Sequence, residues 1–223
     1  MASWKLAVVG VGLLLGGCLQ TTLEHAPTAA MNPRDKALLA NVPYDDKVEI
    51  PTPYQRHIVD YHRQEAAGTI VIDTDNRFLF LVQPDRKAIR YGVTVGEEAQ
   101  GWSGVAKIGK MTEWPSWTPT PGEHERLGPL PPVVPGGPEN PMGARGMYLF
   151  ANGKDTLFRI HGTNQPEYIG ESISSGCIRM TNEDVIDLYN RVKTNSIVVI
   201  LAPNQGDSPN NPQMALGMAV PVH

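Results

Sequence analysis

The sequence predicts a mainly β domain with one short helix near its C-terminal end. Short apolar runs that alternate like strands recur between residues 68 and 202, and turn-forming residues separate them. The 223 residues include 20 Pro and 22 Gly, a content that favours strands, turns and long loops over helices. A chain of this length is long enough for one globular domain plus additional segments.

The first group of strands predicts an antiparallel meander. GTIVIDTDNRFLFLV (68–82) contains two strand-like runs around a turn at 73–76. QPDRKA supplies a second turn, and IRYGVTVG (89–96) alternates like a third strand. Strands joined by such tight turns pair with their neighbours in sequence. SGVAKIGKM (103–111) is a candidate fourth strand.

Residues 112–145 interrupt this pattern with a Pro-rich stretch that has few aliphatic runs. A disordered linker is one interpretation of such a composition. However, Trp114, Trp117 and Met142 need burial, and strand-like sequence resumes at once with GMYLF (146–150). We therefore expect an ordered insertion lying across the sheet, because long loops within compact domains are often functional.

The C-terminal part predicts the short helix between two strands. TLFRI (156–160) is strand-like, and Thr181 is a candidate N-cap for a helix over 181–192 with an acidic first turn. SIVVILA (196–202) predicts a short buried strand. The polar tail 204–223 is expected to be loose and flexible.

The N-terminus resembles that of an exported protein. Residues 1–17 combine an early Lys with an apolar run too short to span a membrane comfortably, which is typical of a signal peptide. The run ends in Leu-Gly-Gly-Cys, which resembles the lipobox of bacterial lipoproteins, where the cysteine, here Cys18, is lipidated and becomes the mature N-terminus. Leu19 in place of Asp favours the outer membrane in such proteins. An ordinary signal peptide or a buried helix with a chance cysteine is the alternative.

Two further segments precede the domain. Residues 18–53 are rich in Thr, Pro, Ala and Asn and predict an extended tether, with an amphipathic patch at 34–40 that is a candidate for docking. Residues 54–67 predict a helical lead-in, because Ile58 and Tyr61 follow helical spacing. The chain thus divides into an export signal, a tether, a lead-in, one domain and a tail.

Charge and composition exclude some classes of partner. The net charge is −4, and the Lys and Arg residues are scattered along the chain rather than clustered. We therefore expect no nucleic acid partner, because phosphate binding needs a basic patch. No spaced group of His, Cys and acidic residues suggests zinc or iron, and no Gly-rich phosphate loop follows a strand. We expect neither a metal nor another cofactor.

The two cysteines have different expected fates. If Cys18 carries lipid, Cys177 is the only remaining thiol, and a lone thiol in an oxidising compartment is a liability unless it is buried or used. Gly176 lets the backbone approach a substrate, and the Ser-Ser-Gly-Cys turn can present N–H groups to an oxyanion. His161 ends a predicted strand, from which its imidazole can take the thiol proton. On composition alone, a buried structural cysteine is the commoner case.

The segment 161–180 resembles the two-part signature of the L,D-transpeptidase catalytic domain, the YkuD-type family. A His-Gly-Thr-Asn element begins at His161, and a Ser-x-Gly-Cys-Ile-Arg-Met element ends at Met180. The resemblance covers residues 68–203, the predicted catalytic domain. It implies a mainly β, YkuD-like β-sandwich or barrel, with a short helix after the catalytic cysteine and the Pro-rich loop over the cleft.

The resemblance also implies roles for individual residues. Cys177 is expected to be the nucleophile and His161 the general base, and the carbonyl of Gly162 is expected to orient the imidazole. The N–H groups of Gly176 and Cys177 are expected to stabilise the oxyanion. Together these groups form the expected catalytic set.

Four more residues of the signature are expected at the substrate-binding surface. Arg179 is expected either to hold a substrate carboxylate or to buttress the turn through an ion pair. Thr163, Asn164 and Ser175 belong to the same two elements and are expected to contact the substrate. Many family members have His where this chain has Ser175, so no second histidine is expected to assist the thiol here.

These roles imply a peptidoglycan L,D-transpeptidase that forms 3→3 cross-links between stem peptides through a thioester on the cysteine. Water as acceptor makes the enzyme an L,D-carboxypeptidase, and an amine on an envelope protein makes it a protein-to-peptidoglycan ligase. A non-catalytic lipoprotein that binds peptidoglycan is a further alternative. With the lipid anchor, the chain is expected at the periplasmic face of the cell envelope, on the outer membrane, acting in cell-wall biogenesis and remodelling.

Overall fold

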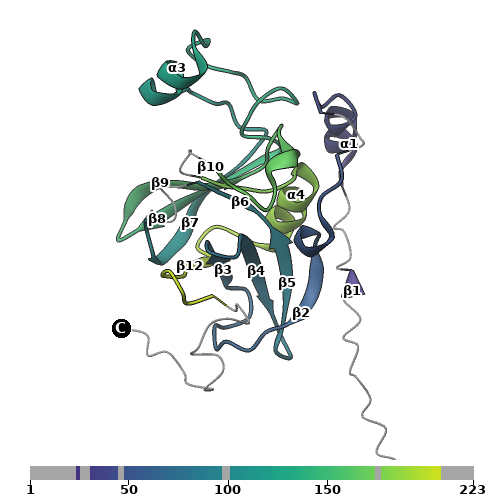
Figure 1. Ribbon diagram of the computed structural model, residues 1–223, viewed down its shortest axis with the longest axis vertical. Coiled ribbons are helices and arrows are strands. Elements are labelled where there is room, and N and C mark those ends of the chain that lie inside the picture. The colour runs from purple at the N-terminus through teal and green to yellow at the C-terminus, as the bar shows by residue number, and fades with distance from the viewer. Residues whose placement is uncertain (1–23, 26–30, 45–47, 97–100, 174–176, 207–223) are drawn as a thin grey trace, which may run out of the picture.

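The computed structural model describes residues 24–25, 31–44, 48–96, 101–173 and 177–206 of the chain. Within them, one sheet contains the strands in the order β1-β2-β5-β4-β3-β12-β7-β8-β9-β11-β6-β10. The sheet bends so that its two halves face each other like the layers of a sandwich, and α4 lies between them at one side (Figure 1). The predicted mainly β fold with few helices is confirmed.

Most of the named elements are short strands. The strands are β1 Glu24–His25, β2 His57–Asp60, β3 Ile70–Asp73, β4 Phe78–Gln83, β5 Lys87–Gly92, β6 Thr94–Gly96, β7 Gly104–Glu113, β8 Arg145–Ala151, β9 Lys154–His161, β10 Ser172–Ile173, β11 Ile178–Arg179 and β12 Ile197–Ile200. The α-helices are α1 Pro33–Leu39, α3 Pro121–Leu127 and α4 Asn182–Arg191, and the 3-10 helices are η1 Thr52–Tyr54 and η2 Pro166–Tyr168.

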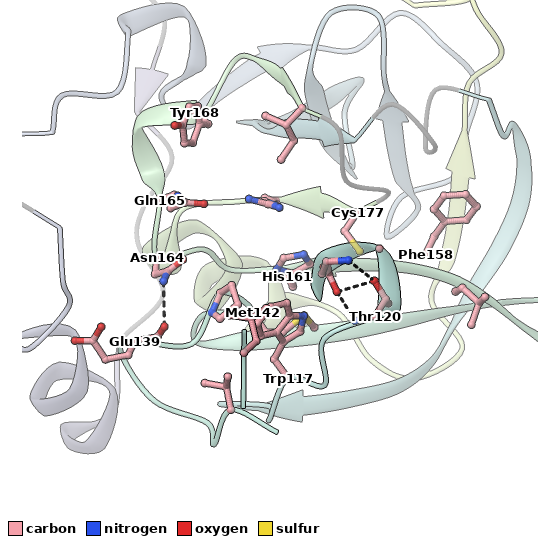
Figure 2. Close-up of a pocket in the computed structure, with 18 of the residues that line it drawn as sticks. Trp117, Thr120, Glu139, Met142, Phe158, His161, Asn164, Gln165, Tyr168 and Cys177 are labelled. Atoms are coloured by element: carbon pink, nitrogen blue, oxygen red, sulfur yellow. Dashed lines mark hydrogen bonds between the residues drawn. The ribbon is translucent and has the colours of Figure 1, made fainter. Parts of the chain in front are cut away.

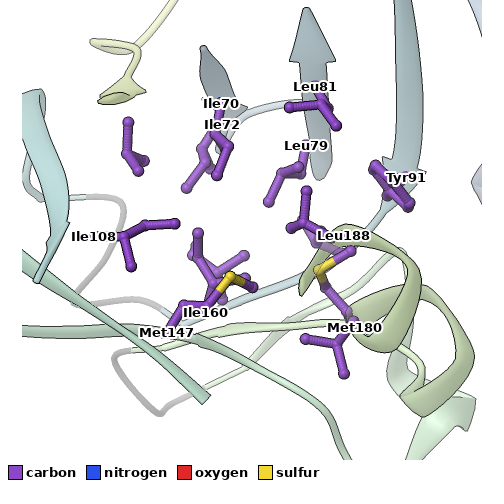
Figure 3. Close-up of a cluster of buried hydrophobic side chains, with 14 of the residues drawn as sticks. Ile70, Ile72, Leu79, Leu81, Tyr91, Ile108, Met147, Ile160, Met180 and Leu188 are labelled. Carbon is purple, nitrogen blue, oxygen red and sulfur yellow. The ribbon is translucent and has the colours of Figure 1, made fainter. Parts of the chain in front are cut away.

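The main hydrophobic core lies between the two halves of the sheet. Ile70 and Leu79 from β3 and β4 face Met147 of β8 and Ile160 of β9, and Leu188 of α4 closes one side (Figure 3). A second, smaller cluster covers the opposite face of β3 and β4 and consists of Tyr61, Val71, Phe80, Val82, Ala88 and Leu201. Both faces of these strands are therefore covered, which explains why their sequences are almost continuously apolar.

The predicted hairpin over 68–82 is confirmed as β3 and β4, which pair antiparallel with Ile70 opposite Leu81. The carboxylate of Asp73 holds the turn, because it accepts hydrogen bonds from the backbone N–H of Asn76 at 3.0 Å and from its side-chain amide at 2.8 Å. β5 then pairs antiparallel with β4, as expected for a meander.

The predicted third strand (89–96) is in fact two strands in different halves of the sheet. β5 ends at Gly92, and after one residue β6 begins to pair with β11 and β10. The alternating sequence contains no sign of this break. The change of pairing partner depends on strands that are distant in the sequence. The crossing brings β6 beside the cysteine segment, where the N–H of Gly96 donates to the carbonyl of Cys177 at 3.1 Å.

The second half of the sheet confirms the strands predicted at 103–111, 146–150 and 156–160. They are β7, β8 and β9, which pair antiparallel in that order. β11 then pairs with β9 in parallel, with Arg179 opposite His161. β12 joins the two halves, because it is parallel to β3 and antiparallel to β7.

The helix predicted after the cysteine is confirmed as α4. The hydroxyl of Thr181 accepts a hydrogen bond from the backbone N–H of Asp184 at 3.1 Å, which is the expected N-cap contact. Val185, Ile186 and Leu188 are fully buried in the main core. α4 therefore fixes the C-terminal end of the signature segment to the hydrophobic core.

The prediction of a helix over 54–67 is wrong. The segment contains β2, which pairs antiparallel with β5, with Ile58 opposite Ile89. Ile58 packs against the main core, whereas Tyr61 packs in the second cluster, so the two side chains do not share one helical face. The open edge of β5 offers unpaired backbone groups, and pairing with them outweighs the helical spacing of two apolar residues.

The tether predicted over 18–53 is partly folded. Residues 33–39 form α1, which is capped by Asn32 and whose Asp35 is buried. The patch at 34–40 is thus docked on the domain rather than extended. No helix in the described part of the chain is long and apolar enough to cross a membrane. Residues 1–23, which include Cys18, and 207–223 of the predicted tail lie outside the described residues.

The Pro-rich stretch 112–145 is an ordered insertion. It continues β7, contains α3 and includes a backbone bridge between Trp117 and Val134. Trp114 is buried, and Trp117 and Met142 are half-buried. In Figure 1 the loop with α3 projects from the β7–β8 end of the sheet, away from β2.

Candidate active site

The parallel pairing of β9 and β11 brings the chain at the predicted nucleophile beside the predicted base. Arg179 lies opposite His161, and Cys177 lies two residues before Arg179. Cys177 thus lies in the bend that leads directly into the strand beside His161. Both side chains line one cavity of about 1020 Å³. Figure 2 shows them near its centre, with Trp117 and Met142 on one side and Gln165 and Tyr168 on the other.

The imidazole of His161 is buried and held in one orientation. Its Nδ1 lies 2.6 Å from the carbonyl oxygen of Gly162, which can only accept a hydrogen bond. Nδ1 therefore carries the proton, and Nε2 is left with its lone pair. Burial, followed by the positive charge of Arg179, lowers the pKa of His161 to about 3, so the ring is neutral near pH 7.

Cys177 is half-buried between β9 and β6. Burial raises the pKa of its thiol, and this effect outweighs the backbone hydrogen bond at Arg159 and the positive charges of Arg159 and Arg179. The resting site therefore contains a neutral thiol and a neutral imidazole rather than a preformed ion pair.

Gly162 is fixed by neighbours that the sequence prediction did not include. Its N–H donates to the carbonyl of Arg145 at 3.1 Å. A side chain at this position would overlap the side-chain amide of Asn182 and the backbone of Ala144, so the close packing requires glycine. The carbonyl that orients His161 thus depends on β8 and on the start of α4.

Asn182 links two loops behind the site. Its Oδ1 accepts from the backbone N–H of Ala144 at 2.8 Å, and its Nδ2 donates to the carbonyl of Thr163 at 2.9 Å. The side chain is 1% exposed. The only sequence signal for it was its place directly after the capping Thr181, and nothing in the sequence indicated that Arg145 would be buried.

The other predicted site residues divide into three groups. Arg179 and Asn164 line the cavity, and Nδ2 of Asn164 donates to the carbonyl of Glu139 in the insertion at 3.0 Å (Figure 2). Thr163 is buried and is not among the lining residues, because its hydroxyl accepts from the backbone N–H of Gln165 at 3.0 Å. Ser175 and Gly176 lie outside the described residues.

The insertion supplies one wall of the cavity. Trp117, Leu130 and Met142 give this wall an apolar surface, and Glu123 and Glu139 add carboxylates. Glu123 belongs to a capping box at the start of α3, in which its carboxylate accepts from the backbone N–H of Thr120 at 2.7 Å. Among the described residues, no group of three or more His, Cys, Asp or Glu could hold a metal ion.

Comparison with known proteins identifies relatives of this chain. The probable L,D-transpeptidase ErfK/SrfK of Escherichia coli is 34% identical over 141 residues, which are 59% of this chain and 43% of that protein. The probable L,D-transpeptidase YbiS of the same species is 32% identical over 133 residues, 56% of this chain and 41% of that one. The chain thus spans less than half the length of these curated relatives.

One solved structure is similar in sequence over most of its length. It is described as a probable carnitine operon oxidoreductase from Brucella melitensis, is 46% identical, and covers 66% of this chain and 94% of its own, with a TM-score of 0.46. The family model of the L,D-transpeptidase catalytic domain matches residues 67–200. This chain belongs to the L,D-transpeptidase catalytic domain family.

Proposed function

We propose that the protein is a lipid-anchored enzyme that forms 3→3 cross-links in peptidoglycan by acyl transfer through Cys177. One observation carries the proposal. Cys177 and His161 line one cavity, and the hydrogen bond of Nδ1 to the Gly162 carbonyl leaves the lone pair of the His161 ring on Nε2. A buried structural cysteine has no need for such an arrangement.

The first half-reaction forms a thioester. Nε2 of His161 takes the thiol proton while the sulfur of Cys177 attacks the carbonyl between the third and fourth residues of a stem peptide. The C–N bond then breaks, and the protonated His161 returns the proton to the leaving amine. The backbone N–H groups of Cys177 and Gly176 are the proposed donors to the oxyanion.

The second half-reaction transfers the acyl group to an acceptor amine. The amine attacks the thioester carbonyl, the C–S bond breaks, and the amine proton passes through His161 to the thiolate. The resting pair is neutral, because burial lowers the pKa of His161 to about 3 and raises that of Cys177. His161 therefore acts as a general base during attack rather than by holding a thiolate in advance.

The charges around the cavity support an amine as the acceptor. Arg179 lines the strand side of the cavity, and its positive charge and that of Arg159 both act on the Cys177 thiol. Glu123 and Glu139 line the opposite wall. A donor carboxylate is attracted to the arginines, and a protonated acceptor amine is attracted to the glutamates.

Turnover of a defined substrate tests the proposal and separates its alternatives. The protein is incubated with disaccharide-tetrapeptide, and the products are separated and identified by mass spectrometry. A 3→3 dimer with release of one D-alanine is expected, and it must be absent with Cys177→Ala. A tripeptide product alone identifies a carboxypeptidase, and peptide attached to an added envelope protein identifies a ligase. Binding without any product, equal in both proteins, contradicts the enzyme and supports a binding lipoprotein.

The proposed anchor at Cys18 is tested in cells that express the full chain. Metabolic labelling with a radioactive fatty acid is expected to label the wild-type protein and not the Cys18→Ala variant. Separation of the membranes on a density gradient is expected to place the labelled protein with the outer membrane. Equal labelling of both proteins excludes Cys18 as the lipidated residue.

A further inference from the structure

The segment before the catalytic domain contributes a buried carboxylate behind the site. Asp35 of α1 is 1% exposed, although it belongs to a stretch that composition predicts as a tether. Both of its carboxylate oxygens accept hydrogen bonds from the guanidinium of Arg145, at 3.0 and 2.5 Å. The indole of Trp114 donates a third, at 2.9 Å. Leu38 and Leu39 of the same helix pack against the main core.

Arg145 connects this carboxylate to the predicted base in two short steps. Its side chain is 1% exposed, so it needs a buried counter-charge. Its backbone carbonyl accepts from the N–H of Gly162 at 3.1 Å, and the carbonyl of Gly162 accepts from Nδ1 of His161 at 2.6 Å. Arg145 thus links Asp35 to Gly162, the residue whose carbonyl fixes the tautomer of His161.

A second residue of the same segment, Tyr44, contacts a side chain that packs against Gly162. The amide of Asn182 donates to the hydroxyl of Tyr44 at 3.3 Å and to the carbonyl of Thr163 at 2.9 Å. Asn182 also packs against Gly162. Asp35 and Tyr44 therefore contact Arg145 and Asn182, respectively. These are the two residues that hold Gly162.

We infer that residues 32–44, the docked segment, are a positioning element of the active site and that Asp35 is its positioning residue. The inference rests on the proposed function for its meaning in catalysis. The docked segment lies outside residues 67–200, the part that matches the family model. The site of this chain is therefore incomplete in the matched domain alone, and a segment between the proposed anchor and the domain completes it.

The test reads the state of the His161 ring directly. Protein labelled with nitrogen-15 in histidine is studied by NMR, and His161→Gln identifies the signals of His161. In the wild-type protein we expect one fixed tautomer, with the proton on Nδ1, and no titration between pH 5 and 8. In Asp35→Asn we expect an averaged tautomer that titrates in this range. The rate of acylation by a carbapenem is expected to fall by up to about 100-fold.

Two further variants separate positioning from general stability. Leu201→Ala truncates a side chain in the second cluster, away from His161, and is expected to lower the Tm by about 10 °C without changing the His161 signals. Asp35→Asn is expected to lower the Tm by a similar amount, about 10 °C. Asp35→Glu keeps the charge and is expected to restore part of the wild-type His161 signal.

The milder Tyr44→Phe keeps the test decisive if Asp35→Asn does not fold. It removes only the hydroxyl near Asn182, and we expect a partial loss of the fixed His161 tautomer with a small fall in Tm. Unchanged His161 signals in Tyr44→Phe and in every Asp35 variant that folds overturn the inference, as do equal changes in Leu201→Ala. Because this NMR readout needs no turnover, a wild-type protein without activity contradicts the proposed function and leaves the test of Asp35 valid.

Discussion

The docked segment (32–44) and the insertion (112–145) both look like connections in the sequence, yet they serve the site from opposite sides. The docked segment presents a fully buried charge, Asp35, to the framework behind His161. The insertion presents half-buried side chains such as Trp117 and Met142 to the cavity itself. The two roles differ in burial. A group that fixes geometry must be shielded from water and immobile, whereas a group that contacts a substrate must stay accessible.

The two segments are also held by different interactions. The docked segment depends on an ion pair with the distant strand β8. The insertion depends mostly on its own polar contacts around Asn140, which is 0% exposed. Nδ2 of Asn140 donates to the carbonyls of Pro115, Val134 and Pro135 at 2.9 to 3.1 Å, and its Oδ1 accepts from the N–H of Met142 at 2.8 Å. Changes behind the cavity are therefore expected to alter chemistry, and changes in the insertion to alter substrate binding.

The largest effect is expected from Asn182→Ala, behind the site. The change leaves the N–H of Ala144 and the carbonyl of Thr163 buried without their partner, at a cost of about 1–3 kcal/mol each. Acylation by a carbapenem is expected to slow by about 100-fold because Gly162 loses its support. Stopped-flow acylation and urea unfolding measure the two quantities. An acylation rate within about twofold of wild type would show that this framework does not position His161.

Asn140→Ala, in the insertion, is expected to have a smaller effect of a different kind. The free energy of unfolding should fall by about 2 kcal/mol, because three carbonyls, one of them in a buried hydrogen bond, lose their donor. The KM for a tetrapeptide donor should rise, while acylation by the small carbapenem should change little. Steady-state kinetics with both reactants check this. Asn140→Asp keeps the acceptor for Met142 but turns a buried carboxylate toward the same carbonyl oxygens, so it should cost more stability than Asn140→Ala.

The pH dependence of stability separates His161 from Asp35. Folding holds the pKa of His161 at about 3 against an ordinary value of 6.5, so between these values only the unfolded chain binds the proton. Stability should therefore fall as pH drops below 6.5, by at most about 1.4 kcal/mol per pH unit for this one proton. His161→Gln should flatten that part of the curve.

Asp35 affects the pH dependence of stability only at lower pH. Burial alone would raise the pKa of its carboxyl, but the hydrogen bonds from Arg145 and Trp114 and the charge of Arg145 outweigh burial and lower it. Its contribution is therefore complete above the ordinary value of 3.8 and is lost as pH falls below it. Urea unfolding at a series of pH values checks both groups. If Asp35→Asn loses stability below pH 3.8 as steeply as the wild-type protein does, this assignment is contradicted.

The smallest effect is expected from Glu123→Gln in the insertion. The negative charge of Glu123 helps to raise the pKa of Cys177, so its removal should lower that pKa. Gln keeps the capping box at the start of α3, which makes the variant a matched change of charge alone. Thiolate absorbance during an alkaline titration, in protein with Cys18→Ala, reports the change. An unchanged pKa would place Glu123 outside the electrostatic reach of the thiol.

The sequence predicts best those features that are set within a few residues. The hairpin held by Asp73, the N-cap Thr181 and the strand that ends at His161 follow from local patterns, and the structure contains all three. The Cys177–His161 pair was predicted from a sequence signature in which both residues occur. The structure adds that both side chains line one cavity.

The features that the sequence does not reveal depend on distant partners. Asp35 has the sequence of an exposed first-turn helix residue, and its burial depends on two distant partners, Trp114 and Arg145. Ile58 and Tyr61 have helical spacing, but the segment pairs with the edge of β5 and forms a strand. Asn182 looks like an ordinary first-turn residue until the loop at Gly162 packs on it. Each outcome is a tertiary contact that no local pattern encodes.

The central claim is that Cys177 forms the covalent intermediate, and intact-mass spectrometry with a carbapenem tests it most directly. Attack of the thiol on the β-lactam carbonyl opens the ring, so the protein should gain the full mass of the antibiotic. Peptide mapping should place the adduct on Cys177, and Cys177→Ala should show none. The account is contradicted if the wild-type protein gains no mass, or if Cys177→Ala gains the same mass as the wild type.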